Sequence, residues 1–294
     1  MATASFQALC DALGASLHTL PDKPQETPAA TLKVLWHLAA GQALSIEAAE
    51  EMPLPELDDA AQARLAELTA QRLSGTPLAH LSGRQRFMRL EMLAGKDALI
   101  PRRETELLGQ AALDLLQGMA GSPCVLDVCT GSGNLALAIA HHAPQARVLA
   151  ADLSAEAVAL AARNAAHLGL GQRVEWRCGD LLEPFNEAPF HGAVDLLVCN
   201  PPYISSQKVD TMAGEISGYE PRLAFDGGPL GIRILQRLIR EAPRYLKPGG
   251  WLAFEVGLGQ GPAVLKRLQA SGAFRQTRRV ADDHGEARVL LASL

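Results

Sequence analysis

The segment Asn200-Pro-Pro-Tyr203 places groups that can hold a planar amino group directly after an apolar stretch of the chain. Residues 194–199 are typical of a buried parallel strand, which two prolines without N–H groups then end. At the carboxyl end of such a strand, the Asn200 amide oxygen and the Pro201 carbonyl could each accept one hydrogen of an NH2 group. The ring of Tyr203 could pack against the plane of that group. The tetrapeptide, Pro202 included, is therefore a candidate catalytic clamp, although it could also be an ordinary turn or a polyproline ligand.

A glycine-containing loop lies upstream, between a predicted strand at 124–128 and a predicted helix that begins near Asn134. Gly131 and Gly133 in this position are typical of a turn that binds a nucleoside-containing ligand. A third glycine at dinucleotide spacing and a Gly-Lys-Ser/Thr sequence are both absent, so neither a pyrophosphate nor a triphosphate is indicated. Asp127, just before the glycines, would disfavour a phosphate and suit a cationic ligand such as a sulfonium.

Two more carboxylates follow predicted strands of the same region. Asp152 ends a strand about 20 residues after the glycines, where a ribose would present its hydroxyl groups. Asp180 follows a third strand and is a candidate acceptor for an adenine amino group, or else a solvated turn residue. Both assignments favour a nucleoside cofactor over other ligands.

The order of predicted elements indicates an α/β fold. From residue 106 to residue 294, strands and helices alternate, which predicts a seven-stranded, doubly wound sheet. The last two strands, near 274–280 and 288–292, have no helix between them and should pair antiparallel. This catalytic domain is expected to follow a small helical domain (1–82) and a hairpin connector (83–105), because apolar residues at helical spacing dominate the first third. The connector arginines are expected to form either a solvated basic face or a partner contact: Arg84, Arg86, Arg89, Arg102 and Arg103.

Composition excludes several classes of protein. The 294 residues are 48% hydrophobic and 20% charged, as expected for a globular chain, and no apolar run is long enough to span a bilayer. Without a membrane segment or a signal core, a cytoplasmic location is expected. The five cysteines lack a Cys-x-x-Cys pair and the eight histidines lack a ligand pattern, so core thiols and no metal are expected. The net charge of −5 argues against broad nucleic-acid binding.

Several segments together resemble a known family. The glycine loop, Asp152 and the Asn200–Tyr203 clamp are similar to those of class I S-adenosylmethionine-dependent methyltransferases that modify a planar nitrogen. Further segments resemble the HemK/PrmC family, the release factor glutamine methyltransferases: residues 77–87, 99–106, 219–228 and 283–289. The resemblance extends from about residue 75 to the C-terminus and is weak before it.

The resemblance implies a fold, a cofactor and a substrate. It implies a Rossmann-like methyltransferase domain that binds S-adenosylmethionine and methylates the side-chain nitrogen of the Gly-Gly-Gln glutamine in peptide-chain release factors. By the same resemblance, the N-terminal helices help to hold the release factor, and the chain is expected to act as a monomer. The cofactor residues that it implies are Asp127, Cys129, Thr130, Gly131, Ser132, Gly133, Asp152, Asp180, Leu181 and Asn200.

Three departures from the family pattern leave the substrate open. Cys129 stands where the family usually has glycine, Arg103 stands where it has proline, and the N-terminal domain matches poorly. A related enzyme could keep the clamp and act on another protein, a small amine or guanidine, or a nucleic-acid base, and a non-catalytic scaffold could keep only the cofactor loop. An acceptor base would call for a basic or aromatic-rich recognition domain, whereas the N-terminal third is apolar and helical.

Overall fold

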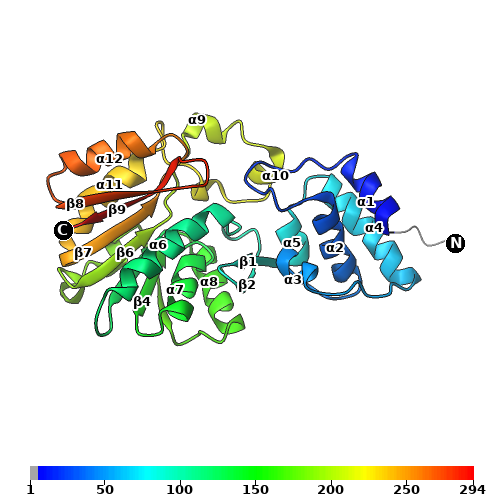
Figure 1. Ribbon diagram of the computed structural model, residues 1–294, viewed down its shortest axis with the longest axis horizontal. Coiled ribbons are helices and arrows are strands. Elements are labelled where there is room, and N and C mark those ends of the chain that lie inside the picture. Colours follow the sequence, from blue (N-terminus) through cyan, green and yellow to red (C-terminus); the bar gives the residue numbers. More distant parts are fainter. Residues whose placement is uncertain (1–5) are drawn as a thin grey trace.

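A computed structural model describes residues 6–294, so the first five residues of the predicted helical domain lie outside the described part. Helices occupy one end of the chain, and a sheet with helices on both faces occupies the other (Figure 1). A small hairpin lies between the two ends (Figure 1).

The N-terminal helices pack around an apolar core of their own. Leu32 and Leu35 of α2 and Leu65 and Leu68 of α4 are buried in it, as their helical spacing predicts. The oxygens of Thr27, Ser45 and Asp58 accept N–H groups in the first turns of α2, α3 and α4, so polar side chains begin these helices. The bounds are α1 (Phe6–Gly14), α2 (Pro28–Ala39), α3 (Ile46–Glu50), α4 (Asp59–Leu73) and α5 (Leu78–Ser82).

The connector begins with a hairpin of β1 (Arg84–Phe87) and β2 (Leu90–Leu93), which pair antiparallel. Its two turn residues, Met88 and Arg89, have positive φ angles of 46° and 70°, as a tight two-residue turn requires. Glu91 of β2 accepts hydrogen bonds from both the backbone N–H and the hydroxyl of Ser45, so the hairpin is attached to the N-terminal helices. A short 3-10 turn, η1 (Arg103–Thr105), then leads into α6 (Glu106–Gln117).

The large sheet confirms the predicted α/β fold. Its strand order is β5-β4-β3-β6-β7-β9-β8, with β3 to β7 parallel and the last two strands antiparallel to their neighbours. After β5 the chain crosses to the other half of the sheet, and the two halves meet between the adjacent strands β3 and β6, which is where open α/β sheets bind ligands. The strands are β3 (Cys124–Val128), β4 (Arg147–Asp152), β5 (Val174–Cys178), β6 (Val194–Cys199), β7 (Leu246–Glu255), β8 (Gln276–Ala281) and β9 (Ala287–Ser293).

Two apolar layers cover the sheet. Alternate residues of the strands, such as Val125 and Leu126 of β3, face opposite layers. One layer includes α6 and α7, and the other includes α11 and α12, so the parallel strands are buried on both faces. The helices are α7 (Asn134–His142), α8 (Ala155–His167), α11 (Arg233–Glu241) and α12 (Gly261–Ala270), and short 3-10 turns occur at η2 (Glu183–Phe185), η3 (Ala188–Phe190) and η5 (Ala242–Arg244).

The segment between the clamp and α11 contains two short helices and a 3-10 turn. It forms α9 (Ser206–Val209), α10 (Gly214–Ser217) and η4 (Arg222–Ala224). This segment reaches across to the N-terminal helices, with α10 beside them (Figure 1). It therefore bridges the two ends of the chain.

Within residues 6–294, no helix has the length and apolar character needed to cross a membrane, and no group of three or more potential ligand side chains could hold a metal ion. The five cysteines are free thiols. The expectation of core thiols is met for Cys199, whereas Cys178 is exposed and the other three are half-buried.

Candidate active site

A pocket opens at the carboxyl ends of β3, β4, β5 and β6. Together with the open solvent at its mouth, the pocket has a volume of about 1040 Å³. Most of the predicted site residues meet in its wall: Cys129, Thr130, Gly131, Ser132, Asp152, Asp180, Leu181, Asn200 and Pro202. Four do not line it: Asp127, Gly133, Pro201 and Tyr203.

The glycine loop turns sharply between β3 and α7. Gly131 and Gly133 have φ angles of 56° and 84°, and a Cβ at Gly133 would lie 2.8 Å from the Trp176 ring. Gly133 is therefore required both by its backbone conformation and by the approach of β5. Cys129 also has a positive φ, of 59°, which gives a physical reason for the family's preference for glycine there.

Asp127 lies buried beneath this loop. Its Oδ2 accepts the Thr130 hydroxyl at 2.6 Å and the Ala136 backbone N–H at 3.1 Å, so it ties the loop to the first turn of α7. Burial raises the pKa of Asp127 to about 7, against the effect of these two hydrogen bonds. Its Oδ1 has no hydrogen-bond partner within the described chain. The structure thus places Asp127 directly behind the pocket wall.

Asp152 stands in the wall itself, at the end of β4. Its two oxygens accept the backbone N–H groups of Gly131 at 2.8 Å and Ser154 at 2.9 Å. Burial raises the pKa of Asp152, and these N–H groups offset part of that rise. Each oxygen keeps a lone pair, so the carboxylate can still accept ligand hydroxyl groups.

Asp180 and Leu181 form the wall at the end of β5. Both oxygens of Asp180 accept Nη1 of Arg237, at 3.0 and 2.8 Å. Asp180 is therefore paired with α11, which the sequence did not predict. Leu181 is buried and has a φ of 51°, a further strained position at the pocket.

The clamp residues separate at the end of β6. Asn200 and Pro202 face the pocket, while Pro201 is buried. The Tyr203 hydroxyl donates to the Glu255 carboxyl at 2.8 Å, outside the pocket wall. Asn200 Nδ2 donates to the Thr105 hydroxyl at 3.1 Å. The Asn200 Oδ1 has no hydrogen-bond partner in residues 6–294 and remains available to a ligand.

The backbone of the clamp is supported by residues far away in sequence. Gln260 Nε2 donates to the Tyr203 carbonyl at 2.9 Å, and the Gly257 N–H donates to Gln260 Oε1 at 2.9 Å. A Cβ at Gly227 would lie 2.6 Å from the Pro202 carbonyl, and one at Gly231 would lie 2.3 Å from the Tyr203 carbonyl. These glycines let one loop lie directly against the clamp. The Gly-Gly-x-x-Gly spacing was their only sequence signal.

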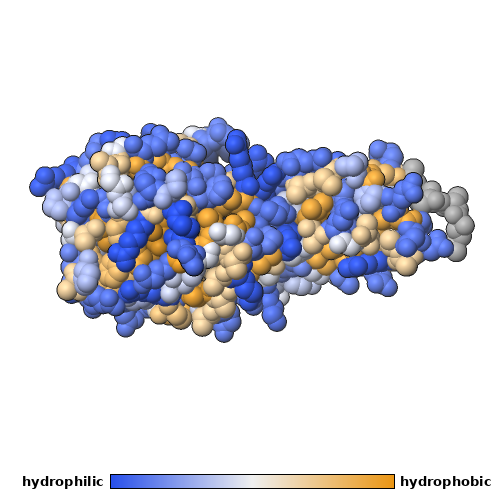
Figure 2. All heavy atoms as spheres, turned by 90° about the horizontal axis from the view of Figure 1, so that it is seen from below, coloured by the Kyte–Doolittle hydropathy of each residue, from blue (hydrophilic) through white to orange (hydrophobic). Residues whose placement is uncertain are grey.

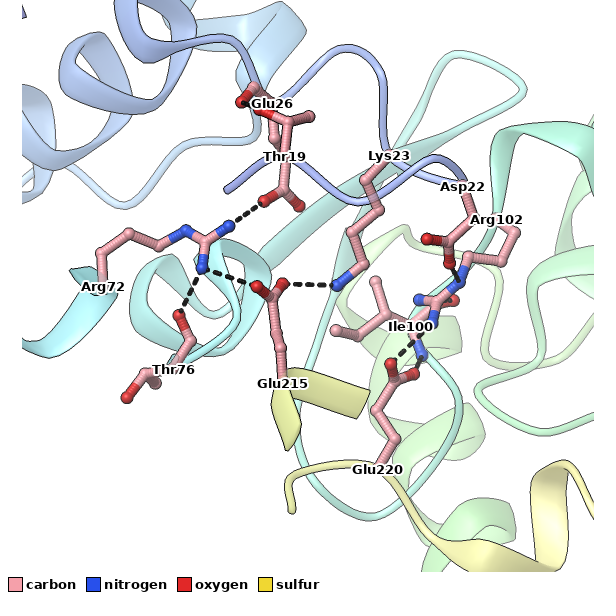
Figure 3. Close-up of polar contacts among 10 residues, drawn as sticks. All are labelled: Thr19, Asp22, Lys23, Glu26, Arg72, Thr76, Ile100, Arg102, Glu215 and Glu220. Carbon is pink, nitrogen blue, oxygen red and sulfur yellow. Dashed lines mark hydrogen bonds and ion pairs between the residues drawn. The ribbon is translucent and has the colours of Figure 1, made fainter. Parts of the chain in front are cut away.

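The opposite wall is fixed by Glu220. Its carboxyl accepts Arg102 Nη2 at 2.6 Å and the Ile100 N–H at 2.9 Å (Figure 3). This joins residues 99–102 to Pro221. The pocket is lined by Pro221 and, from that range, by Leu99, Pro101 and Arg102. For Arg102, the predictions of a solvated face and of a partner contact are both wrong, because the side chain is buried and paired within the chain. No local sequence pattern around Glu220 indicated its pairing with Arg102.

A second cluster of charges joins the N-terminal helices to α10. Glu215 pairs with Lys23 at 2.9 Å and with Arg72 at 2.8 Å, and Arg72 also pairs with Glu26 at 2.8 Å (Figure 3). The four side chains are at most 9% exposed. Burial alone would raise the pKa of Glu215, but Lys23 and Arg72 outweigh it and lower that pKa. The helical domain therefore holds the segment that borders the pocket.

S-adenosylmethionine fits the groups of this pocket. Asp152 offers an acceptor for ribose hydroxyl groups, and Asp180 with Leu181 offers a polar and an apolar contact for adenine. The hydroxyl of Ser132 is buried at the wall and has no partner in the described chain, so a polar ligand group can satisfy it.

Comparison with known proteins identifies the family. A methyltransferase domain model matches residues 125–218. The release factor glutamine methyltransferase of Moorella thermoacetica is 38% identical over 97% of this chain and 98% of its own length. The protein of the same name from Caulobacter vibrioides is 35% identical over 96% and 95% of the two chains. The chain belongs to the release factor glutamine methyltransferase family.

For this family, S-adenosylmethionine is the methyl donor, as the resemblance implied. The family match also includes the N-terminal helices, since it extends over nearly the whole chain. Solved structures share the fold alone. The hMettl16 catalytic domain in complex with a MAT2A 3'UTR hairpin has a TM-score of 0.56 at 14% identity, covering 77% of this chain and 82% of its own. A human methyltransferase 10 domain containing protein has a TM-score of 0.52 at 17% identity, covering 78% and 96%.

Replacing Asp152 with alanine should weaken S-adenosylmethionine binding. The change removes a charged acceptor, which is worth about 1.5–3 kcal/mol, so the dissociation constant should rise about ten- to hundredfold. Isothermal titration calorimetry measures this directly. Glu67→Ala, on the exposed face of α4, is the matched control and should leave the affinity unchanged. Equal affinity of Asp152→Ala and the parent chain would remove Asp152 from the cofactor site.

Replacing Gly231 with alanine should displace the clamp. Its Cβ would meet the Tyr203 carbonyl, so turnover should fall by about tenfold or more, while cofactor affinity changes little. Gly272→Ala is the control, because Gly272 has a similar φ of 66° but nothing within 4 Å of its added Cβ. That variant should lose about 1 kcal/mol of stability and keep its turnover. The same loss of turnover in both variants would show that backbone strain, not contact with the clamp, is responsible.

Proposed function

We propose that this chain transfers a methyl group from S-adenosylmethionine to the side-chain amide nitrogen of a glutamine in peptide-chain release factors, within the Gly-Gly-Gln sequence. The observation that carries the proposal is the end of β6. There, Asn200 lines the cofactor pocket and its Oδ1 has no hydrogen-bond partner in residues 6–294, in a chain whose relatives are named for this reaction. We also propose that the reaction takes place in the cytoplasm and that the chain works as a monomer.

The residues of the clamp address the main difficulty of the reaction. An amide nitrogen is a poor nucleophile because its lone pair is delocalised into the carbonyl group. S-adenosylmethionine, when bound, supplies a methyl group on a positively charged sulfur. Asn200 Oδ1 accepts one amide hydrogen. The Pro201 carbonyl, which has no hydrogen-bond partner in residues 6–294 although the residue is buried beside the pocket wall, accepts the other, and both favour the partly cationic nitrogen that develops during attack. They also hold the lone pair in line with the methyl carbon.

The step balances without a strong base. The new bond joins the amide nitrogen to the methyl carbon, and the carbon–sulfur bond breaks with both electrons left on sulfur, giving a neutral thioether. The nitrogen then carries one proton too many, is strongly acidic, and loses that proton to water. The protein's contribution is therefore position and polarity.

The N-terminal helices are proposed to hold the release factor. They leave an apolar groove between α1, α2 and α4, and apolar residues interrupt the polar surface on this end of the molecule in the view of Figure 2. Leu73 lines the groove and is 43% exposed. An exposed apolar groove of this kind suits a protein partner. Its residues include Leu9, Leu32, Trp36, Leu57 and Leu65.

Asn200→Ala should largely abolish turnover. Removing one oriented polar contact to the reacting group costs roughly 10²–10³ in rate. Cofactor affinity should stay within a few-fold, because the glycine loop and Asp152 remain. Single-turnover kinetics with a release factor, together with calorimetry of cofactor binding, separate the two effects. Turnover equal to that of the parent chain would remove the clamp from the mechanism.

Methylation of a folded release factor should occur at the glutamine of Gly-Gly-Gln, as seen by tandem mass spectrometry. Changing that glutamine to glutamate should abolish it, because the carboxylate has neither of the hydrogens that the clamp holds and adds a negative charge. A short Gly-Gly-Gln peptide should be methylated with a higher KM than the folded factor, since it cannot use the apolar groove.

Total RNA and free amino acids serve as competing acceptors in the same assay. Stronger labelling of either one, or persistent labelling of the glutamate variant, would contradict the substrate assignment and leave the methyltransferase activity in place. Equal KM values for peptide and folded factor would contradict docking on the N-terminal helices alone.

A further inference from the structure

Thr105 contacts the Asn200 side chain of the clamp. It is 1% exposed and belongs to η1, the short turn before α6. Its hydroxyl oxygen accepts Asn200 Nδ2 at 3.1 Å. A hydroxyl that accepts in this way still has one proton to donate elsewhere.

Glu255, at the end of β7, is a buried carboxyl group beside the end of β6, because Phe254 pairs with Cys199. Glu255 is 1% exposed, and its Oε1 accepts the Tyr203 hydroxyl at 2.8 Å. Its Oε2 has no close partner among residues 6–294. A buried oxygen without a partner is costly, so a donor should be available to it. The Thr105 hydroxyl, which Asn200 contacts, is the candidate donor, and it lowers the pKa of this carboxyl.

We propose that Thr105 and Glu255 are positioning residues, which fix the orientation of the Asn200 amide so that its oxygen faces the substrate. The inference rests on the proposed function, since it assigns a use to the free oxygen of Asn200. Neither residue touches the reacting atoms; both act through Asn200.

The orientation follows from a single proton. When Glu255 is ionised, it can only accept, so the Thr105 hydroxyl proton points to it. The lone pairs of Thr105 then face Asn200 and select the NH2 end of its amide. The reversed amide would set two oxygens against one another, which is unfavourable in a buried site. The Asn200 oxygen is thereby turned toward the pocket.

Protonation of Glu255 should weaken the preference for this orientation of the Asn200 amide. A protonated Glu255 can donate to Thr105, whose own proton is then free to turn toward the Asn200 oxygen. Burial raises the pKa of Glu255 to about 7, the Thr105 hydroxyl lowers it, nearby Glu104 raises it, and Tyr203 and Arg288 lower it. Arg288 Nη2 lies 3.0 Å from Glu104 and 3.7 Å from Glu255, so this cluster contains one arginine for two carboxyl groups.

The test uses three variants of the full chain. Thr105→Val keeps the shape of the side chain and removes the hydroxyl, so kcat should fall about ten- to hundredfold while the dissociation constant of S-adenosylmethionine stays within a few-fold. Thr105→Ser restores the hydroxyl and should recover most of kcat. The rate of the parent chain should rise with pH through about 7, as Glu255 ionises, and Glu255→Gln should lose that step.

Asp127 has a pKa of about 7 as well, so Asp127→Asn is the control for the pH profile. Retention of the step in Glu255→Gln and its loss in Asp127→Asn would overturn the assignment. A kcat of Thr105→Val equal to that of the parent chain would also overturn the proposal. So would a Thr105→Ser variant whose kcat stays low, because that result would mean that the size of the side chain matters and the hydroxyl does not.

A second measurement does not depend on the substrate. The side-chain NH2 signal of Asn200 can be followed in a ¹⁵N NMR spectrum. It is assigned by its absence from the spectrum of Asn200→Ala. We expect it to exchange slowly with solvent, to shift near pH 7, and to exchange faster in Thr105→Val. A signal that is insensitive to pH and to Thr105→Val would refute the orientation mechanism. The expected NMR behaviour without methylation of any release factor would refute the proposed function and leave the orientation mechanism standing.

Discussion

The end of β6 is the constraint on which the rest of the structure depends. Parallel strands end at one edge of the sheet, so the Asn200 clamp necessarily lies beside the glycine loop after β3 and beside Glu255 at the end of β7. The two prolines stop the strand there because they cannot donate to a neighbour. A cofactor loop, an acceptor for a planar amide and a buried carboxyl group are thus brought together by strand order alone.

Buried ion pairs connect this edge to the rest of the chain. Glu215 and Glu220, both after the clamp in sequence, are held by Arg72 of α4 and by Arg102 of the connector. Loss of Arg102 would leave the buried Glu220 carboxylate unpaired, at a cost of about 3–5 kcal/mol. The N-terminal helices and the segment from α9 to η4 therefore belong to one structural unit. In the proposed function, the release factor therefore binds to the same structural unit that forms one wall of the pocket.

Local sequence patterns predicted the parts of the site that lie within single turns. The glycine loop, Asp152 and the clamp each follow one strand, so residue type and spacing are enough to recognise them. Arg102 illustrates the limit, because its carboxylate partner, Glu220, is 118 positions away and no local pattern records the pairing. The same holds for Gln260 below Tyr203 and for Thr105 beside Asn200, whose contacts arise only when distant segments fold together. Asp127 was expected close to the cofactor but lies behind the loop, since its carboxyl holds the first turn of α7.

The most direct test of the account is a crystal structure of this chain with S-adenosylhomocysteine and a Gly-Gly-Gln peptide bound together. The account predicts the thioether in the pocket between the glycine loop and Asp152. It also predicts the glutamine side-chain nitrogen within hydrogen-bond distance, about 3 Å, of both the Asn200 Oδ1 and the Pro201 carbonyl. A glutamine amide held by other groups, or an Asn200 amide turned with its nitrogen toward the peptide, would contradict the account.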